Sequence, residues 1–326
     1  MNNQHLVLPE EAGQRLDTLL ATLFPEQSRG FWQRAIEEGQ ITVNGKSVKS
    51  KLALKEGQEI TIQLPKNDQQ LTPINFPIPV LYEDEDILVI NKPAGIVVHP
   101  NSYQEEESVV QALLATHPKL AEVIYDPESD ISKLRPGIVH RLDKDTSGVL
   151  VVAKNQTSLH NLAQQFHDHT TQKTYVAFVA GKLTEPKTIH TAIKRKAGRE
   201  NVMGISTDLN DGREAISHFK PLHQFQIAHI NTWVSEIECQ IETGRTHQIR
   251  VHCKYMGMPV LGDELYGNKP SLLATKKLGA ARQMLHARRL EITHPSSGEK
   301  MTFTAPFPSD MESVLSAAKR LDTQSL

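Results

Sequence analysis

Apolar residues in the N-terminal part of the chain recur with the period of an α-helix. One amphipathic helix is predicted to end at Pro25, with an inner face formed by Leu16, Leu19, Leu20, Leu23 and Phe24. Ser28 can cap a second helix that ends at Gly39, with an inner face formed by Phe31, Trp32, Ala35 and Ile36. The pattern therefore predicts two short helices in succession.

Strand patterns follow these helices. Residues 41–43 lead into Asn44-Gly45, a strong short hairpin signal, and a further strand is predicted at 59–64. Two helices and a small sheet make a compact domain over residues 1–65. The polar segment 66–76 is predicted to be a linker.

The next part of the chain, 77–308, consists mainly of predicted strands and forms a second domain, followed by a tail at 309–326. These strands cover residues 80–82, 87–90, 149–152, 173–181, 233–242, 287–293 and 301–305. Residues 233–242 alternate as a half-buried strand does. Strands outnumber helices and no strand–helix unit repeats, which favours an α+β fold over a doubly wound α/β sheet.

Helical spacing appears at three places in this second domain. One helix is predicted near 109–114, and a second at 157–167 has Thr157 available as its cap. Thr246 can cap a third, which runs to Gly257. On this helix one face is predicted to leave the core and to suit anions, and it carries His247, Arg250, Val251 and Lys254.

Composition and charge narrow the possible functions. At 326 residues the chain suggests two domains. No apolar run reaches the roughly 18 residues of a membrane span, and no secretory signal is visible. Cys239 and Cys253 form no metal motif or disulfide framework, which favours a reducing cytoplasm. The formal net charge of -2 argues against nucleic-acid binding through bulk charge alone, so any phosphate-binding surface must be a local patch.

A dense polar cluster, HRLDKDTS at 140–147, stands directly before the apolar strand at 149–152. Burying such a cluster is costly unless each group has a partner, so it is either a structural hydrogen-bond network or an active site. Asp143 lies between cationic side chains and an apolar strand, which favours its ionised form and suits a nucleophile or a base. Tyr175 adds a ring that can stack on a nucleic-acid base.

Several other kinds of site find no support in the sequence. It contains no Gly-rich phosphate loop, no His-Glu-x-x-His motif and no Gly-x-Ser-x-Gly motif. The spacings of His252, His286 and His294 match no standard metal site. We therefore expect no bound metal.

The first domain resembles an S4 RNA-binding domain. The resemblance rests on Ser28-Arg29 at the start of the second helix, the VNG hairpin at 43–45 and the KEG turn at 55–57. It implies phosphate contacts from the basic residues Arg15, Arg29, Arg34, Lys46, Lys49 and Lys51. The alternative for these residues is an ordinary solvated surface.

The second domain resembles the RluA-type pseudouridine synthase family. The central motif of this resemblance is HRLDKDTSG at 140–148. The other motifs occur in the family's order: LVINKPAG at 88–95 precedes it, and KTYVA at 173–177, TGRTHQIRVH at 243–252, GDELYG at 262–267 and LHA at 285–287 follow it. The resemblance implies a catalytic domain with a mixed, mainly antiparallel sheet flanked by helices and loops. It also implies isomerisation of uridine to pseudouridine within RNA, without a cofactor.

The resemblance also assigns roles to single residues. Asp143 is the essential acid, which either attacks the ribose C1′ or removes the C2′ proton. Tyr175 stacks on the uracil, and Arg250 pairs with Asp143 and orients it. Substrate contacts are expected from His140, Arg141, Ile249 and Leu285, the last two as apolar walls. Arg141 would fill the space that the flipped uridine leaves; its alternative is a structural ion pair with Asp143 or Asp145.

RNA is the partner that these features imply. Further RNA contacts are expected from Lys194, Arg195, Lys196, Arg245, His247 and Lys254, although the run at 194–196 could be a solvated loop. The S4 module favours large-subunit ribosomal RNA over transfer RNA, and a monomer is the default. Two other functions compete: a catalytically silent RNA-binding factor in ribosome assembly, and a carboxylate glycosidase, which needs a second placed carboxylate.

Overall fold

The computed structural model describes residues 2–25, 27–64, 71–100, 107–196, 198, 202–227 and 230–322. The chain divides into two compact units, Met1–Gln70 and Leu71–Leu326, and each has its own hydrophobic core. Within the described ranges, no helix has the length and apolar character that crossing a membrane requires.

The smaller unit packs two helices against a four-stranded antiparallel sheet of order β1-β4-β2-β3. Its elements are β1 (Asn2–Leu6), the 3-10 helix η1 (Pro9–Glu11), α1 (Leu16–Leu23), α2 (Arg29–Glu37), β2 (Ile41–Val43), β3 (Lys46–Ser47) and β4 (Glu59–Gln63). The predicted cap is confirmed, because Ser28 Oγ accepts a hydrogen bond from the Phe31 amide. The hairpin is confirmed as well, with Asn44 and Gly45 in left-handed conformations between β2 and β3.

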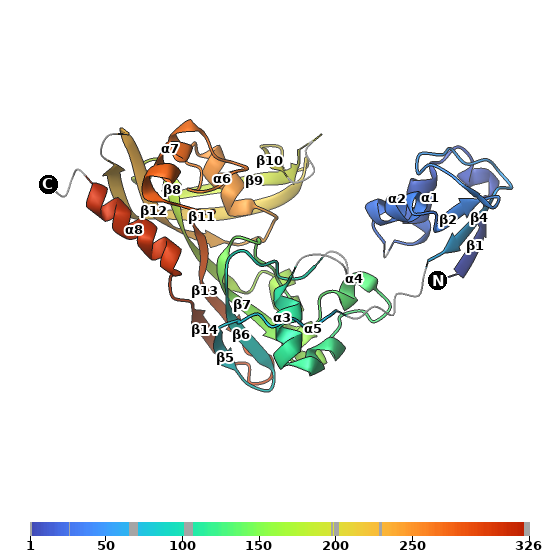
Figure 1. Ribbon diagram of the computed structural model, residues 1–326, viewed down its shortest axis with the longest axis horizontal. Coiled ribbons are helices and arrows are strands. Elements are labelled where there is room, and N and C mark those ends of the chain that lie inside the picture. The colour runs from blue at the N-terminus through green and yellow to red at the C-terminus, as the bar shows by residue number, and fades with distance from the viewer. Residues whose placement is uncertain are drawn as a thin grey trace. The chain divides into compact units, whose positions relative to one another are not determined.

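The larger unit is built on a ten-stranded sheet of order β10-β9-β11-β12-β8-β13-β7-β6-β5, with β14 paired to β13 (Figure 1). The strands are β5 (Val80–Glu83), β6 (Ile87–Lys92), β7 (Ser147–Ala153), β8 (Gln172–Ala180), β9 (Lys187–Arg195), β10 (Met203–Ser206), β11 (Arg213–Ile227), β12 (Thr232–Ile241), β13 (Leu285–Thr293) and β14 (Lys300–Thr304). Only β13 and β7 pair in parallel among these strands. The predicted α+β class and the mixed, mainly antiparallel sheet are confirmed.

Helices cover this sheet, and Figure 1 shows α3 and α5 near β6 and β7, with α8 beside β11 and β12. The helices are α3 (Val109–Thr116), the 3-10 helix η2 (Pro118–Glu122), α4 (Asp130–Lys133), α5 (Gln156–His167), α6 (Gln248–Tyr255), α7 (Lys269–Leu278) and α8 (Ser309–Leu321). Buried residues of α8, among them Met311 and Val314, pack into a core cluster with Phe225 of β11.

Two local predictions were wrong, and a third holds for part of a strand. Asn155, not Thr157, caps α5, since its Oδ1 accepts a hydrogen bond from the Ser158 amide at 2.9 Å. Thr246 does not cap α6; the helix begins after His247, whose backbone is left-handed with φ 56°. Strand β12 is half-buried only toward its C-terminal end, where Glu238 and Gln240 are not buried, whereas Val234 and Glu236 on the same face are buried.

The domain boundaries need one adjustment at each end of the second domain. Residues 71–76, assigned to the linker, belong to the larger unit, and Leu71 is part of its core. Residues 66–70 lie outside the described ranges. The segment 309–322, assigned to a tail, contains α8 and is also part of the larger unit.

Gly148 fixes how closely β7 approaches β13. It pairs with Ala287 across the parallel ladder and has φ +119°, and an added Cβ would overlap the Ala287 carbonyl. Only glycine fits this conformation and this contact. The polar cluster predicted as a possible active site ends directly at this position.

Gly148→Ala is therefore expected to lower the free energy of unfolding of the larger unit by about 2–4 kcal/mol, since strain and overlap add. Denaturant unfolding of the full chain measures the change. Gly244→Ala is the matched control, because a Cβ there meets nothing within 4 Å. Equal stability of the two variants would contradict the close approach of the strands.

Candidate active site

The turn that carries Asp143 is held by a buried lysine at the end of β6. Lys92 Nζ donates hydrogen bonds to the carbonyl oxygens of Pro93, Lys144 and Thr146 at 2.8, 2.8 and 2.9 Å. Burial lowers the pKa of Lys92 to about 7. This lysine, which we did not predict as a site residue, fixes the backbone on both sides of Asp145.

A second set of bonds reaches the same turn from the segment before β13. Arg282 Nη1 donates to the Asp145 carbonyl at 2.8 Å, and its Nε lies 2.6 Å from Asp310 Oδ2 of α8. Gln283 Nε2 donates to Thr146 Oγ1 at 3.0 Å. The polar cluster is thus partly a structural network, and Asp143 is the carboxylate of this cluster that lines the same cavity as Tyr175.

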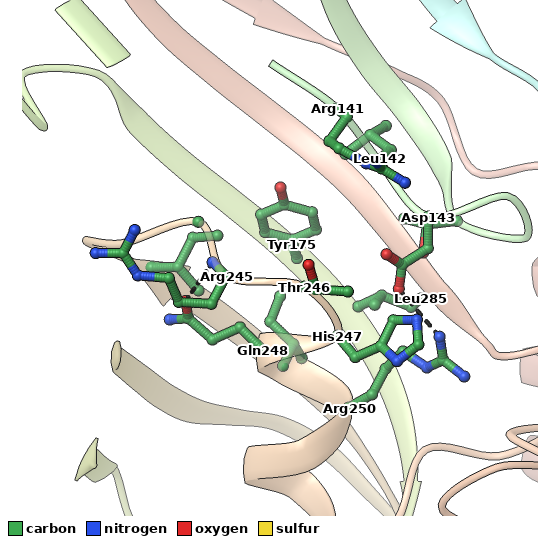
Figure 2. A pocket seen from close by; sticks show the side chains of 14 residues that line it. Arg141, Leu142, Asp143, Tyr175, Arg245, Thr246, His247, Gln248, Arg250 and Leu285 are labelled. Atoms are coloured by element: carbon green, nitrogen blue, oxygen red, sulfur yellow. Dashed lines mark hydrogen bonds and ion pairs between the residues drawn. The ribbon is translucent and has the colours of Figure 1, made fainter. Parts of the chain in front are cut away.

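Arg250 lies between two carboxylates. Its Nη1 is 3.1 Å from Asp143 Oδ2, while Nε and Nη2 are 2.6 and 2.9 Å from the two oxygens of Asp263. Burial alone would lower the pKa of Arg250, but Asp263 and Asp143 outweigh burial and raise it. The guanidinium therefore stays charged and holds the Asp143 carboxylate in one orientation (Figure 2).

The predicted exposure of Arg250 was wrong. Its side chain is 6% exposed, whereas Lys254, expected on the same outward face, is exposed. Asp263 explains the difference. Its fully buried carboxylate accepts two hydrogen bonds from Arg250, and this pairing makes burial of the guanidinium possible. Asp263 was missed as a site residue, although it lies in the GDELYG motif at 262–267.

Tyr175 lies across the cavity from Asp143, on the central strand β8 (Figure 2). Burial, and then the charge of Asp143, raise the pKa of its phenol above the ordinary value. The hydroxyl therefore stays protonated at neutral pH. A ring in this position can stack on a planar base, and the hydroxyl can donate a hydrogen bond.

The remaining walls of the cavity are partly apolar. Leu142, Ile241, Ile249 and Leu285 contribute apolar surface, and the polar lining comes from Arg141, Thr146, Arg245, Thr246, His247 and Gln248. The structure thus brings the predicted residues Asp143, Tyr175, Arg250, Ile249 and Leu285 into one site. Arg141 is exposed at its edge.

His140 does not line this cavity, so the structure does not support its predicted substrate contact. Its ring stacks on Phe166 with centroids 4.4 Å apart, and its Nε2 accepts a hydrogen bond from the Val151 amide at 3.0 Å. Burial lowers the pKa of His140 to about 3, so the ring is neutral. Its contacts are with α5 and β7.

A second cavity of about 710 Å³ adjoins the first, and both are lined by Asp143, His247 and Arg250. Of the predicted RNA-contact residues, Arg195 lines this cavity, and Arg245 lines the first. Lys194 forms an ion pair with Asp211, and Lys194, Lys196 and Lys254 are exposed.

The histidines weighed as metal ligands are engaged in hydrogen bonds. His252 and His286 are buried and contact hydroxyl groups, among them Ser147 Oγ at 2.9 Å from His286. His294 lies near Asp84 and Asp86. The carboxylate oxygens of these two residues already accept bonds from the Tyr82 hydroxyl, backbone amides, Asn155 and Ser158, which is the pattern of a structural network.

In the smaller unit, two of the predicted RNA-contact residues share a buried carboxylate. Asp17 accepts bonds from Arg15 at 3.0 and 2.9 Å, from Arg29 at 3.1 Å and from Gln33 at 2.6 Å. Arg15 and Arg29 remain 38% and 49% exposed. Lys46 and the other predicted contact residues of this unit, Arg34, Lys49 and Lys51, are also exposed.

Asp17→Asn is expected to destabilise the smaller unit by about 2–4 kcal/mol, because two arginines lose a charged partner. Burial alone would raise the pKa of Asp17, but the bonds from Arg15, Gln33 and Arg29 outweigh it and lower the pKa. The stabilisation is therefore complete above the ordinary Asp value of 3.8 and lost as pH falls below it.

Trp32 fluorescence in a Trp233→Phe background would follow unfolding of the smaller unit. The control is Glu56→Gln, which removes the same charge at an exposed position. If both variants lower the stability equally, the buried network does not stabilise the fold.

The sequence and the fold were compared with known proteins. A family model described as RNA pseudouridylate synthase matches residues 86–255, and one described as S4 domain matches residues 14–60. An uncharacterised RNA pseudouridine synthase of Synechocystis is 42% identical over 93% of this chain and 88% of that protein. A ribosomal large subunit pseudouridine synthase D of Xanthomonas campestris is 38% identical over 97% of this chain and 92% of that protein.

A solved structure gives the same result. Human RNA Pseudouridylate Synthase Domain Containing 1 matches with a TM-score of 0.56 and 27% identity, over 71% of this chain and 84% of that chain. The resemblances noted in the sequence are thereby confirmed. The chain belongs to the RNA pseudouridylate synthase family and carries an S4 domain.

Proposed function

We propose that this protein converts specific uridines of large-subunit ribosomal RNA to pseudouridine, with Asp143 as the essential catalytic residue. The observation that carries the proposal is the Asp143 carboxylate, oriented by Arg250 at 3.1 Å in a cavity whose opposite wall is Tyr175. A buried guanidinium beside a carboxylate keeps a reactive anion in place. The enzyme would act as a monomer in the cytoplasm.

The chemistry is an isomerisation. The N-glycosidic bond between N1 and C1′ breaks, the uracil turns, and a C5–C1′ bond forms. C5 loses a proton and N1 gains one, so atoms balance without a co-substrate or redox cofactor. Asp143 either attacks C1′ or removes the C2′ proton, and Tyr175 stacks on the uracil with its protonated hydroxyl available for a proton transfer.

Arg141 is proposed to fill the stack when the uridine leaves it. Its guanidinium is exposed at the edge of both cavities, and its plane can stack on a neighbouring base. Flipping a base out of structured RNA costs a few kcal/mol, which such stacking would partly offset.

The substrate proposal rests on the relatives. Proteins named ribosomal large subunit pseudouridine synthase D, from Xanthomonas campestris and Neisseria meningitidis, align with nearly the whole chain. The S4 domain adds the exposed Arg15 and Arg29 for phosphate contacts. Two alternatives are transfer RNA as the substrate and a catalytically silent RNA-binding role in ribosome assembly. The experiments below distinguish them.

Asp143→Asn is expected to abolish pseudouridine formation, a loss of at least about 10³-fold, since the amide can neither attack nor take a proton. The assay incubates unmodified ribosomal or transfer RNA with wild type or variant and maps pseudouridine. Asp130→Asn, a surface change, is the control and should keep full activity.

Each alternative gives its own result in this assay. If wild type makes no pseudouridine in either RNA but binds it, the silent RNA-binding function is favoured. Free uracil in place of pseudouridine would indicate a glycosidase. Activity confined to transfer RNA would reject the ribosomal substrate.

Arg141→Ala is expected to lower kcat/KM about 10-fold more on structured RNA than on an unstructured oligonucleotide with the same target uridine. The reason is that a uridine in an unstructured oligonucleotide has fewer stacking contacts, so flipping it leaves less stacking for Arg141 to replace. Equal losses on both substrates would reject the stacking role and favour a structural ion pair.

A further inference from the structure

Tyr266 contacts four residues, of which Met203, His247 and Arg250 line the cavities of the candidate site. Its hydroxyl accepts a hydrogen bond from the Met203 amide at 2.8 Å and lies 2.9 Å from His247 Nδ1. Its ring packs against Arg250 and Lys254, whose cationic groups are 5.2 and 5.6 Å from the ring centroid. The side chain is 1% exposed, so its hydroxyl is shielded from bulk water and relies on buried partners.

These contacts determine which ring nitrogen of His247 carries the proton. A backbone amide only donates, so the Tyr266 oxygen accepts from Met203 and its single hydrogen must find another acceptor. Nδ1 of His247 is that acceptor among the described residues in contact with the hydroxyl. The Nδ1 lone pair is therefore used by the tyrosine, and the proton of a neutral imidazole lies on Nε2.

We infer that Tyr266 is a positioning residue that holds His247 as its neutral Nε2–H tautomer. In this tautomer Nε2–H donates a hydrogen bond to a ribose or phosphate oxygen of the nucleotide bound at Asp143. His247 lines both cavities, with Asp143 and Arg250 beside it (Figure 2). The tautomer follows from the contacts alone. The identity of the acceptor rests on the proposed function.

The surroundings of His247 agree with a neutral ring. Burial lowers its pKa, and Arg250 and Arg141 act in the same direction, whereas Asp143 and Asp263 oppose them. His247 would thus act as a directional hydrogen-bond donor in the RNA contact that the sequence predicted. Its left-handed backbone, φ 56°, is uncommon for a residue with a side chain and is a conformation often found at functional sites.

The tautomer can be measured by NMR on the full chain with ¹⁵N-labelled histidine rings, using His247→Asn to assign the signal. We expect protonated Nε2 and a hydrogen-bonded, unprotonated Nδ1 at neutral pH. Tyr266→Phe should remove the Nδ1 hydrogen bond and raise the pKa of His247, because that bond stabilises the neutral ring. Tyr255→Phe, on an exposed ring of α6, should change neither. A protonated Nδ1 in the wild type would overturn the inference.

Single-turnover rates test the role in catalysis. Tyr266→Phe keeps the ring against Arg250 and is expected to lower the rate about 10-fold, the typical effect of one hydrogen bond. In a His247→Asn background the same change should have no further effect. Equal losses in both backgrounds would show that Tyr266 acts structurally. An inactive wild type would reject the proposed function and leave the NMR result to decide the tautomer.

Discussion

The candidate active site depends on one buried guanidinium shared by two carboxylates. Arg250 donates two hydrogen bonds to Asp263 and one to Asp143. Asp263 thus neutralises and orients the guanidinium, while the Asp143 carboxylate still lines the cavity. A lone buried arginine would be costly, and a lone carboxylate in an apolar site would tend to take up a proton. The two carboxylates make a charged Arg250 compatible with a folded core.

Much of this arrangement could be predicted from the sequence, because its parts are local. The helices, the Asn44-Gly45 hairpin and the buried strand after Asp143 follow from spacing within a few residues. Motif resemblance identified Asp143 and Tyr175, which the structure places on opposite walls of one cavity.

What could not be predicted depends on contacts between distant segments. Helical periodicity placed Arg250 on an outward face, since nothing near it in sequence reveals the buried Asp263. His140 was expected to contact the substrate because it belongs to the HRLDKDTSG motif, yet its ring stacks on Phe166 and accepts a hydrogen bond from the Val151 amide. Lys92 and Tyr266 lie in recognised motifs, but only the fold shows which atoms they bind.

The bonds from Arg282 have a consequence for how the enzyme is made. Arg282 lies 137 residues after Asp145 and donates a hydrogen bond to the Asp145 carbonyl. It also donates a hydrogen bond to Asp310 of α8. Contacts of such sequence separation form late in folding because a long loop must close first. During synthesis the turn at Asp143 leaves the ribosome well before the segments that fix it. An unfinished chain would thus carry the whole HRLDKDTSG segment and still be unable to shape its turn.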